Sequence, residues 1–151
     1  MRIVIMGCGR VGASLANDFA SEGNEVTVLD IDPAAFRFLS DDFTGTKIIG
    51  SGIDADVLKR AHIERADAFV SATRGDNRNV MAAQIAKHVF GVPVVATRVF
   101  DPLREEMYRN MGLRTINPTR VQSKRLKRVI EAPDDESASE MAREFMRQDG
   151  D

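Results

Sequence analysis

Six short segments rich in β-formers alternate with longer helical stretches, and this alternation is the feature that most constrains the fold. The segments are residues 2–7, 25–32, 46–52, 68–73, 93–99 and 113–118. The first five are nearly continuous apolar runs without a polar alternation, which is typical of strands that helices cover on both faces. Repeated strand–helix units of this kind predict an α/β fold with a Rossmann-like, doubly wound and mostly parallel six-stranded sheet.

The helices between these strands are predicted to begin at aspartates. Asp32 and Asp101 each precede a proline, Asp54 precedes residues 55–61, and Asp76 precedes residues 77–90. An aspartate in this position accepts hydrogen bonds from the free N–H groups of a helix start, and proline suits the first helical turn. Because ligands of such sheets bind beyond the carboxyl ends of the strands, we expect the functional residues there.

A glycine-rich turn follows the first strand and opens a helix. The first glycine of such a turn permits a tight bend, the second lets a diphosphate approach the backbone, and the third lets helix and strand pack closely. The N–H groups of the turn then point toward the phosphates. The predicted phosphate-binding residues are Gly7, Cys8, Gly9, Arg10, Val11 and Gly12.

Two aspartates compete for the ribose of such a nucleotide. Asp32 precedes Pro33 and is explained as a helix cap, whereas Asp30 ends the second strand and can accept hydrogen bonds from both ribose hydroxyls. A carboxylate there repels a 2′-phosphate, which disfavours NADP. NAD(H), ATP, ADP and AMP all carry an unmodified adenosine ribose, so an acid at this position does not discriminate among them.

Arg10 lies where a helix start carries roughly half a positive charge, so a cation there costs about 0.3–1 kcal/mol unless something negative is bound. A bound phosphate reverses that cost, and the guanidinium then adds charge-assisted hydrogen bonds. Without a ligand, the alternative is that the side chain extends into solvent. The same arginine is also placed to reach a nucleotide held by a neighbouring subunit.

Composition and net charge argue against several other classes of protein. A chain of 151 residues with 43% hydrophobic residues suits one main core. The net charge of −2 provides no field that attracts nucleic acid, and no apolar run reaches the roughly 18–20 residues of a membrane span. The single cysteine, Cys8, excludes an internal disulfide. We therefore expect a cytoplasmic protein with no nucleic-acid partner, which reaches a membrane only through another protein.

Candidates for catalysis and metal binding are explained more simply in other ways. Tyr108 is followed four residues later by Gly112, so the Tyr-x-x-x-Lys arrangement of short-chain dehydrogenases is absent. His62 and His88 end predicted helices, where a histidine interacts favourably with the helix dipole. Cys8 is expected to be a small packed residue. We predict no catalytic and no metal-binding residues; a small NAD-dependent oxidoreductase or redox sensor is the alternative.

Residues near the C-terminus change in character. Residues 121–131 form a short helix with a basic face, and an acidic hinge follows around Pro133. After the hinge, apolar residues recur with helical spacing from Ala138 to Met146. We expect a main domain over residues 1–133 and, over residues 134–151, an acidic hinge with a short amphipathic helix.

Successive motifs, taken together, resemble the regulator-of-potassium-conductance family, also called potassium-transport nucleotide-binding (RCK, KTN or TrkA-N) domains. The resemblance covers residues 2–133 and is carried by VIMGCGRVG, VTVLDIDP, GSGIDADVLKRAHIERADAFVSATRGDNRNVMAAQIAK, VVATRVFD and MGLRTINP in this order. It implies that Arg10 contacts phosphates and that Asp30 binds ribose. It further implies cofactor-binding roles for Ile31, Asp32, Ser51, Gly52, Ala72, Thr73, Asn79 and Arg98.

In that family the domains are regulators and not enzymes. The resemblance implies a homodimer that assembles into an octameric ring and gates a membrane-embedded potassium-translocating subunit as an adenine nucleotide binds. It also implies that residues 118–131 form a crossover helix, whose apolar residues Val121, Leu126, Val129 and Ile130 pack on the partner. The second, C-terminal lobe of the family is not expected within residues 134–151.

Overall fold

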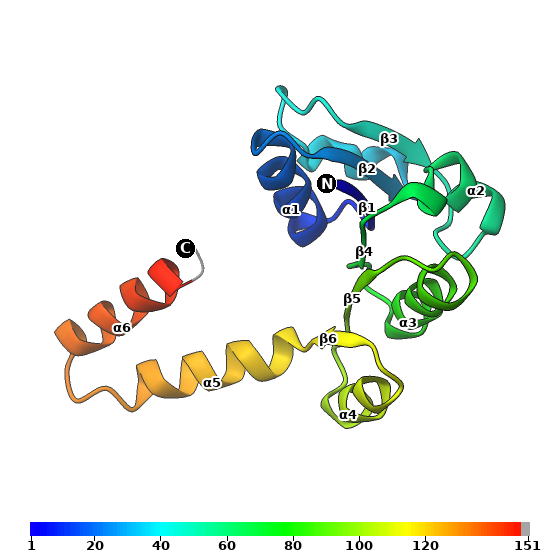
Figure 1. Cartoon of the computed structure of the whole chain (residues 1–151). Coiled ribbons are helices and arrows are strands. Elements are labelled where there is room, and N and C mark those ends of the chain that lie inside the picture. The colour runs from blue at the N-terminus through cyan, green and yellow to red at the C-terminus, as the bar shows by residue number, and fades with distance from the viewer. Residues whose placement is uncertain (149–151) are drawn as a thin grey trace. The chain divides into compact units, whose positions relative to one another are not determined.

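The computed structural model describes residues 1–148, and in this range six parallel strands form one sheet with the order β3-β2-β1-β4-β5-β6 (Figure 1). The strands are β1 (Arg2–Met6), β2 (Glu25–Asp30), β3 (Thr46–Ile49), β4 (Ala68–Ser71), β5 (Val94–Arg98) and β6 (Arg114–Ile116). All five strand pairings are parallel. The predicted Rossmann-like sheet of six strands is therefore confirmed.

Helices connect these strands. They are α1 (Arg10–Ser21), the 3₁₀ helix η1 (Pro33–Phe38), α2 (Ala55–Arg60), the 3₁₀ turn η2 (Ile63–Arg65), α3 (Asp76–Gln84), its π-helical continuation η3 (Ile85–Val89) and α4 (Pro102–Asn110). Helix α1 covers one face of the sheet, and α2 and α3 cover the other (Figure 1). The helix expected after Asp32 is thus a short 3₁₀ helix.

Two hydrophobic clusters occupy the two faces of the sheet. Ile3 and Ile5 pack in one cluster with the first turns of α1, whereas Val4 and Met6 pack in the other cluster, which includes Leu58. Because successive side chains of a strand point to opposite faces, a strand with core on both sides must be apolar throughout. This explains why the strand segments show no polar alternation in the sequence.

Three of the four expected aspartate caps are confirmed. The carboxylates of Asp32, Asp54 and Asp101 accept hydrogen bonds from backbone N–H groups of the turns that they open. The prediction for Asp76 is wrong: Gly75 is the N-cap residue of α3, and Asp76 is its first residue. The Asp76 carboxylate instead accepts two N–H groups of the loop after β5.

The chain divides into two compact units, Met1–Ile116 and Asn117–Asp151. The second unit contains α5 (Pro118–Ile130) and α6 (Asp135–Gln148), and residues 149–151 of the predicted segment 134–151 lie outside the described residues. Helix α5 begins three residues before the predicted start, because the Asn117 side chain accepts a hydrogen bond from the Arg120 N–H at 2.8 Å. Phe145 of α6 is buried against the guanidinium groups of Arg125 and Arg128 on α5.

Candidate functional site

The carboxyl ends of the parallel strands meet at one edge of the sheet, and the turns that follow them are joined by backbone hydrogen bonds. The Gly7 N–H after β1 donates to the Leu29 carbonyl of β2 at 2.7 Å, and the Ala72 N–H after β4 donates to the Met6 carbonyl at 2.8 Å. The predicted site residues of β1, β2 and β4 thus lie at the same edge of the sheet.

The three glycines of the turn after β1 differ in what surrounds them. Gly7 has a φ of 101°, and a β-carbon on it would lie 2.9 Å from the Thr73 nitrogen. A β-carbon on Gly12 would overlap the Gly7 carbonyl oxygen, whereas one on Gly9 would meet no atom within 4 Å. The fold itself therefore requires Gly7 and Gly12, and the open space above Gly9 is available to a ligand.

The start of α1 offers its N–H groups to that open space. Gly9 is the N-cap residue, no side chain caps the helix, and its first turn contains no acid. Arg10 and Val11 are exposed in this turn, and the Arg10 side chain has no hydrogen bond or ion pair to any residue in the described range 1–148. The helix start thus combines free backbone donors with an unpaired guanidinium, which is an arrangement that attracts an anion.

Asp30 lies under this turn at the end of β2. Its carboxylate accepts hydrogen bonds from the Cys8 N–H at 2.7 Å and from the Asp32 N–H at 2.9 Å. Asp32 caps the next helix, because its carboxylate accepts a hydrogen bond from the Ala34 N–H at the start of η1. The two carboxylates thus accept N–H groups of different turns.

Ile31, Ser51 and Gly52 lie in the loops after β2 and β3, at the same carboxyl-terminal edge of the sheet. Ile31 is 57% exposed directly beside Asp30. The Gly50 N–H donates to the Asp30 carbonyl at 2.9 Å, and a β-carbon on Gly52 would overlap the Met6 side chain. Ser51 and Gly52 are therefore held against the end of β1, next to the glycine turn.

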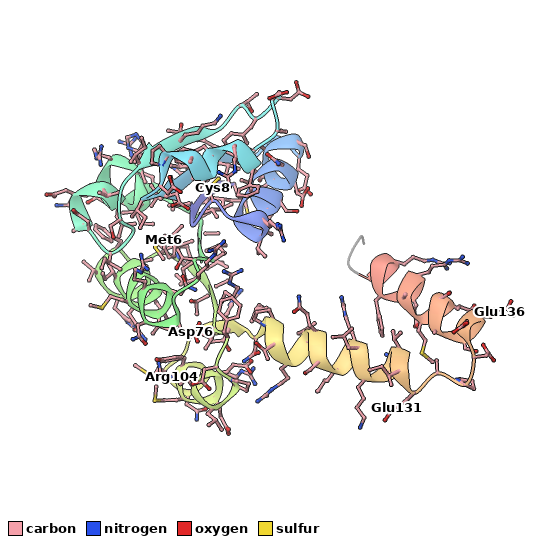
Figure 2. All side chains as sticks on the ribbon, turned by 180° about the vertical axis from the view of Figure 1, so that it is seen from behind. Met6, Cys8, Asp76, Arg104, Glu131 and Glu136 are labelled. Atoms are coloured by element: carbon pink, nitrogen blue, oxygen red, sulfur yellow. The ribbon has the colours of Figure 1, made fainter. Side chains whose placement is uncertain are left out.

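Cys8 lies between the sheet and α1 and is fully buried (Figure 2). Burial raises the pKa of its thiol to about 11, and the nearby negative charge of Asp30 acts in the same direction. A thiol with this pKa is protonated and unreactive at neutral pH. Cys8 is thus the packed residue that the sequence predicts, and its backbone N–H donates to Asp30.

Asn79 joins the ends of β4 and β5 from the first turns of α3. Its side-chain oxygen accepts hydrogen bonds from the N–H and hydroxyl of Thr73, and its amide nitrogen donates to the carbonyls of Thr73 and Arg98. Asn79 is completely buried and all its side-chain hydrogen-bonding atoms are engaged. It fixes the loop in which Thr73 lies rather than presenting its own amide at the surface.

The Arg98 side chain lies at the same junction. Its Nη2 donates to the Thr73 carbonyl at 2.8 Å, and its guanidinium stacks on the Phe100 ring at 4.5 Å from the centroid. Burial lowers the pKa of the Arg98 guanidinium, nearby Arg74 acts in the same direction, and Asp76 opposes them. Its Nε is buried without a hydrogen-bond partner in the described part of the chain.

Sequence reasoning missed the buried polar contact between β4 and β5. The Ser71 hydroxyl donates to the Asn79 carbonyl at 2.8 Å and lies 2.7 Å from the Thr97 hydroxyl. Both hydroxyls are almost wholly buried. The sequence signal for this contact is a polar residue near the end of each of these two otherwise apolar strands, Ser71 in β4 and Thr97 in β5.

The groups considered for catalysis or metal binding lie elsewhere or are buried. His62 follows α2 and precedes β4, at the opposite edge of the sheet, His88 lies in η3, and Tyr108 is buried in the core. Among residues 1–148, no group of three or more His, Cys, Asp and Glu side chains could hold a metal ion. Nor is any helix in this range long and apolar enough to cross a bilayer.

Comparison with known proteins agrees with this architecture. The family model of the TrkA-N domain matches residues 3–118. The chain belongs to the TrkA-N domain family. A relative, the Trk system potassium uptake protein TrkA of Streptomyces coelicolor, is 47% identical over 120 residues, which are 80% of this chain and 54% of that protein. The chain thus spans about half the length of this relative.

Solved structures share the TrkA-N fold. The Kef CTD of Shewanella denitrificans in its AMP-bound form superposes with a TM-score of 0.73 at 19% identity, covering 99% of this chain and 93% of that one. The GsuK channel bound to NAD superposes with a TM-score of 0.67 at 21% identity, covering 80% of this chain and 22% of that one.

Proposed function

We propose that this chain is a regulatory domain of a potassium transporter or channel and that it binds an adenine nucleotide, NAD(H), ATP, ADP or AMP, at the glycine turn. The observation that carries the proposal is the pairing of an open, uncapped helix start at Gly9 with the Asp30 carboxylate under the same turn. Membership of the TrkA-N family supports it, as do a relative named for Trk potassium uptake and neighbours solved with AMP and NAD.

Each site residue has a role in this proposal. The free N–H groups of residues 9–12 and the Arg10 guanidinium bind phosphate, and Asp30 accepts the ribose hydroxyls. Ile31, Asp32, Ser51 and Gly52 border the adenosine, and Ala72 and Thr73 border the phosphates on the β4 side. Asn79 and Arg98 are positioning residues, because both hold the Thr73 carbonyl.

Regulation requires that the nucleotide favour one of two shapes of an assembly, because a ligand shifts an equilibrium only by its differential affinity. We propose a homodimer, assembled into an octameric ring, that contacts a membrane-embedded potassium-translocating subunit from the cytoplasm. The apolar residues of α5 support a partner: Leu126 is 63% and Ile130 is 81% exposed. In this proposal the functional domain extends to residue 133, so that α5 crosses to the second copy, and the predicted segment 134–151 follows it with the helix α6.

The oxidoreductase or redox-sensor alternative is not favoured. The relative is named as a potassium uptake protein, and the one thiol at the site, that of Cys8, is buried with a raised pKa. We propose that the chain is not an enzyme. Turnover of a nicotinamide cofactor by the purified protein would contradict this.

Isothermal titration with AMP, ADP, ATP, NAD⁺ and NADH tests the binding site. We expect binding of at least one of these nucleotides, loss of that binding in Asp30→Ala, and weaker binding of phosphate-rich ligands in Arg10→Gln. Asp41→Ala removes an exposed carboxylate in the loop before β3 and is the matched control. Unchanged affinities in both site variants would remove the site assignment.

The mass of the protein in solution tests the assembly. We expect a dimer or a larger species by light scattering, and dissociation when Leu126 and Ile130 are both replaced by serine. A monomer at high concentration would contradict the ring.

A further inference from the structure

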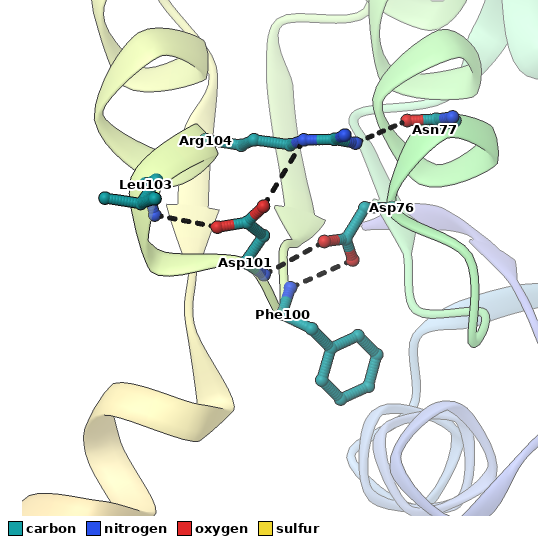
Figure 3. Close-up of polar contacts among 6 residues, drawn as sticks. All are labelled: Asp76, Asn77, Phe100, Asp101, Leu103 and Arg104. Carbon is teal, nitrogen blue, oxygen red and sulfur yellow. Dashed lines mark hydrogen bonds and ion pairs between the residues drawn. The ribbon is translucent and has the colours of Figure 1, made fainter.

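A hollow of about 660 Å³ lies where α3 and α4 begin. It is lined by residues 74–78, Phe100 and Arg104, which come from the loops after β4 and β5 and from the first turns of the two helices. Asp76 and Arg104 lie together in this region in Figure 2, and Figure 3 shows the polar contacts that frame it. None of the predicted site residues lines this hollow.

The carboxylates of this region are already satisfied by the chain itself. The two oxygens of Asp76 accept the Phe100 N–H at 2.9 Å and the Asp101 N–H at 3.0 Å. Asp101 accepts the Leu103 N–H at 2.9 Å with one oxygen and lies 3.3 Å from the Arg104 Nε with the other (Figure 3). Both carboxylates are therefore held in place by hydrogen bonds or an ion pair within the chain.

The arginines are more numerous than the acids. Arg104 is fixed by Asp101 and by a 3.1 Å hydrogen bond to the Asn77 side chain, which leaves its Nη2 free to face a ligand. Arg74 and Arg78 have no hydrogen bond or ion pair to any residue in the described range 1–148. Three guanidinium groups thus line the hollow with one carboxylate, that of Asp76.

This arrangement has an electrostatic cost that Asp76, the one acid in the first turn of α3, offsets only in part. Arg78 lies in the first turn of α3, where the helix dipole disfavours a cation. Burial is the main reason that the pKa of the neighbouring Arg98 is lowered; Asp76 opposes this shift and the positive charge of Arg74 adds to it. An anion in the hollow lowers the cost of the clustered positive charge, and guanidinium groups match phosphate oxygens in geometry as well as charge.

The hollow also adjoins the glycine turn. Thr73 directly precedes Arg74 in the chain, and its nitrogen is the atom that a β-carbon on Gly7 would approach to 2.9 Å. The Thr73 carbonyl is held by Arg98 and Asn79, so this connection is rigid. A ligand that has one phosphate on the glycine turn therefore has the arginine-lined hollow as its neighbour on the β4 side.

We propose that Arg74, Arg78 and Arg104 form an oxyanion site for phosphate groups, adjacent to the glycine turn. Its position relative to the first phosphate rests on the proposed function. The phosphate comes either from the outer part of the same nucleotide, as in ATP, or from a separate phosphate compound. In the first case nucleotide affinity depends on the number of phosphate groups, and in the second a phosphate compound binds beside the nucleotide.

Titration of the full chain with AMP, ATP and inorganic pyrophosphate, in buffer with EDTA, tests this proposal. The variants are Arg74→Gln, Arg78→Gln and the double variant; Arg65→Gln, an exposed arginine at the amino end of β4, is the matched control. If the outer phosphates of ATP fill the site, the double variant lowers the affinity for ATP by about tenfold or more and changes that for AMP by less than about twofold. If a separate compound fills it, pyrophosphate binds the wild type in the presence of AMP, and the double variant loses this binding.

The proposal is overturned if the double variant matches Arg65→Gln both in its ratio of ATP to AMP affinity and in its affinity for pyrophosphate. Failure of the proposed function looks different, because then none of the adenine nucleotides binds the wild type, and the pyrophosphate titration still decides the oxyanion site. The melting temperature of the unliganded variants separates binding from folding. Since both substitutions remove a cation near a helix start, it should stay unchanged or rise.

Discussion

The Asp30 carboxylate accepts the Cys8 backbone N–H at 2.7 Å, so the acid that ends β2 holds the glycine turn that follows β1. The same carboxylate accepts the Asp32 N–H with its other oxygen. A residue proposed to bind ribose therefore also shapes the turn proposed to bind phosphate. Binding and stability must be separated when Asp30 is changed.

The variant Asp30→Asn separates the effect on nucleotide binding from the effect on stability. The amide oxygen can still accept the Cys8 N–H, but the charge is lost and one acceptor becomes a donor facing the Asp32 N–H. Hydrogen bonds to charged groups contribute about 1.5–3 kcal/mol. We expect urea unfolding to show a loss of no more than about that size, and calorimetry to show a loss of nucleotide affinity of about tenfold or more. Retention of full affinity by a folded Asp30→Asn protein would contradict the ribose role.

The glycines of the turn give a second prediction, because the structure separates those that the fold needs from the one that faces open space. Gly12→Ala places a methyl group on the Gly7 carbonyl oxygen, so we expect a large loss of stability. Gly9→Ala meets no atom within 4 Å and should cost about 1 kcal/mol or less as an N-cap change. Thermal melts and nucleotide titrations check this: Gly9→Ala should fold but bind nucleotide weakly. Normal binding by Gly9→Ala would exclude a close phosphate at this residue.

Much of the fold could be predicted from the sequence, because its signals are local. The apolar strands, the strand-to-helix glycine turn and the caps at Asp54 and Asp101 each involve residues close in the chain. The helix after Asp32 was predicted only in part. It is the short 3₁₀ helix η1, and turn-forming residues follow it from Ser40 to Gly45.

The parts that the sequence did not predict depend on contacts between distant residues. Asp76 looks like a helix cap, but its partners are the N–H groups of Phe100 and Asp101, more than 20 residues later. The hollow likewise combines Arg74 and Arg78 with Arg104 from the next helix. Nothing in the local pattern of either segment indicates that they meet.

Asn79 provides a third prediction, since its side chain makes four hydrogen bonds that tie Thr73 and Arg98 together. Asn79→Ala leaves buried backbone groups without partners, and each such group costs about 1–3 kcal/mol. We expect a loss of at least about 3 kcal/mol in the free energy of unfolding, measured with urea. Asn77→Ala on the exposed side of the same helix is the control and should change stability little. A small loss in Asn79→Ala would mean that water replaces the amide and that the loop is not rigid.

The buried thiol of Cys8 gives a prediction on pH. Its pKa rises from an ordinary value of 9.0 to about 11 on folding, because burial and the charge of Asp30 disfavour the thiolate. A pKa raised by folding contributes stability that is fully present below about pH 9 and is lost as the pH rises through about 11. We expect the free energy of unfolding to fall more steeply with pH in the wild type than in Cys8→Ala over this window.

Urea unfolding at intervals between pH 8 and 11.5 measures that difference, and the lysines and Tyr108 cancel because both proteins carry them. The same burial should leave Cys8 unreactive toward a disulfide reagent at pH 8 until the protein unfolds. Parallel pH curves for the two proteins, or rapid labelling of the native thiol, would show that Cys8 is exposed to solvent. In that case the turn that it shares with Asp30 would be open rather than packed.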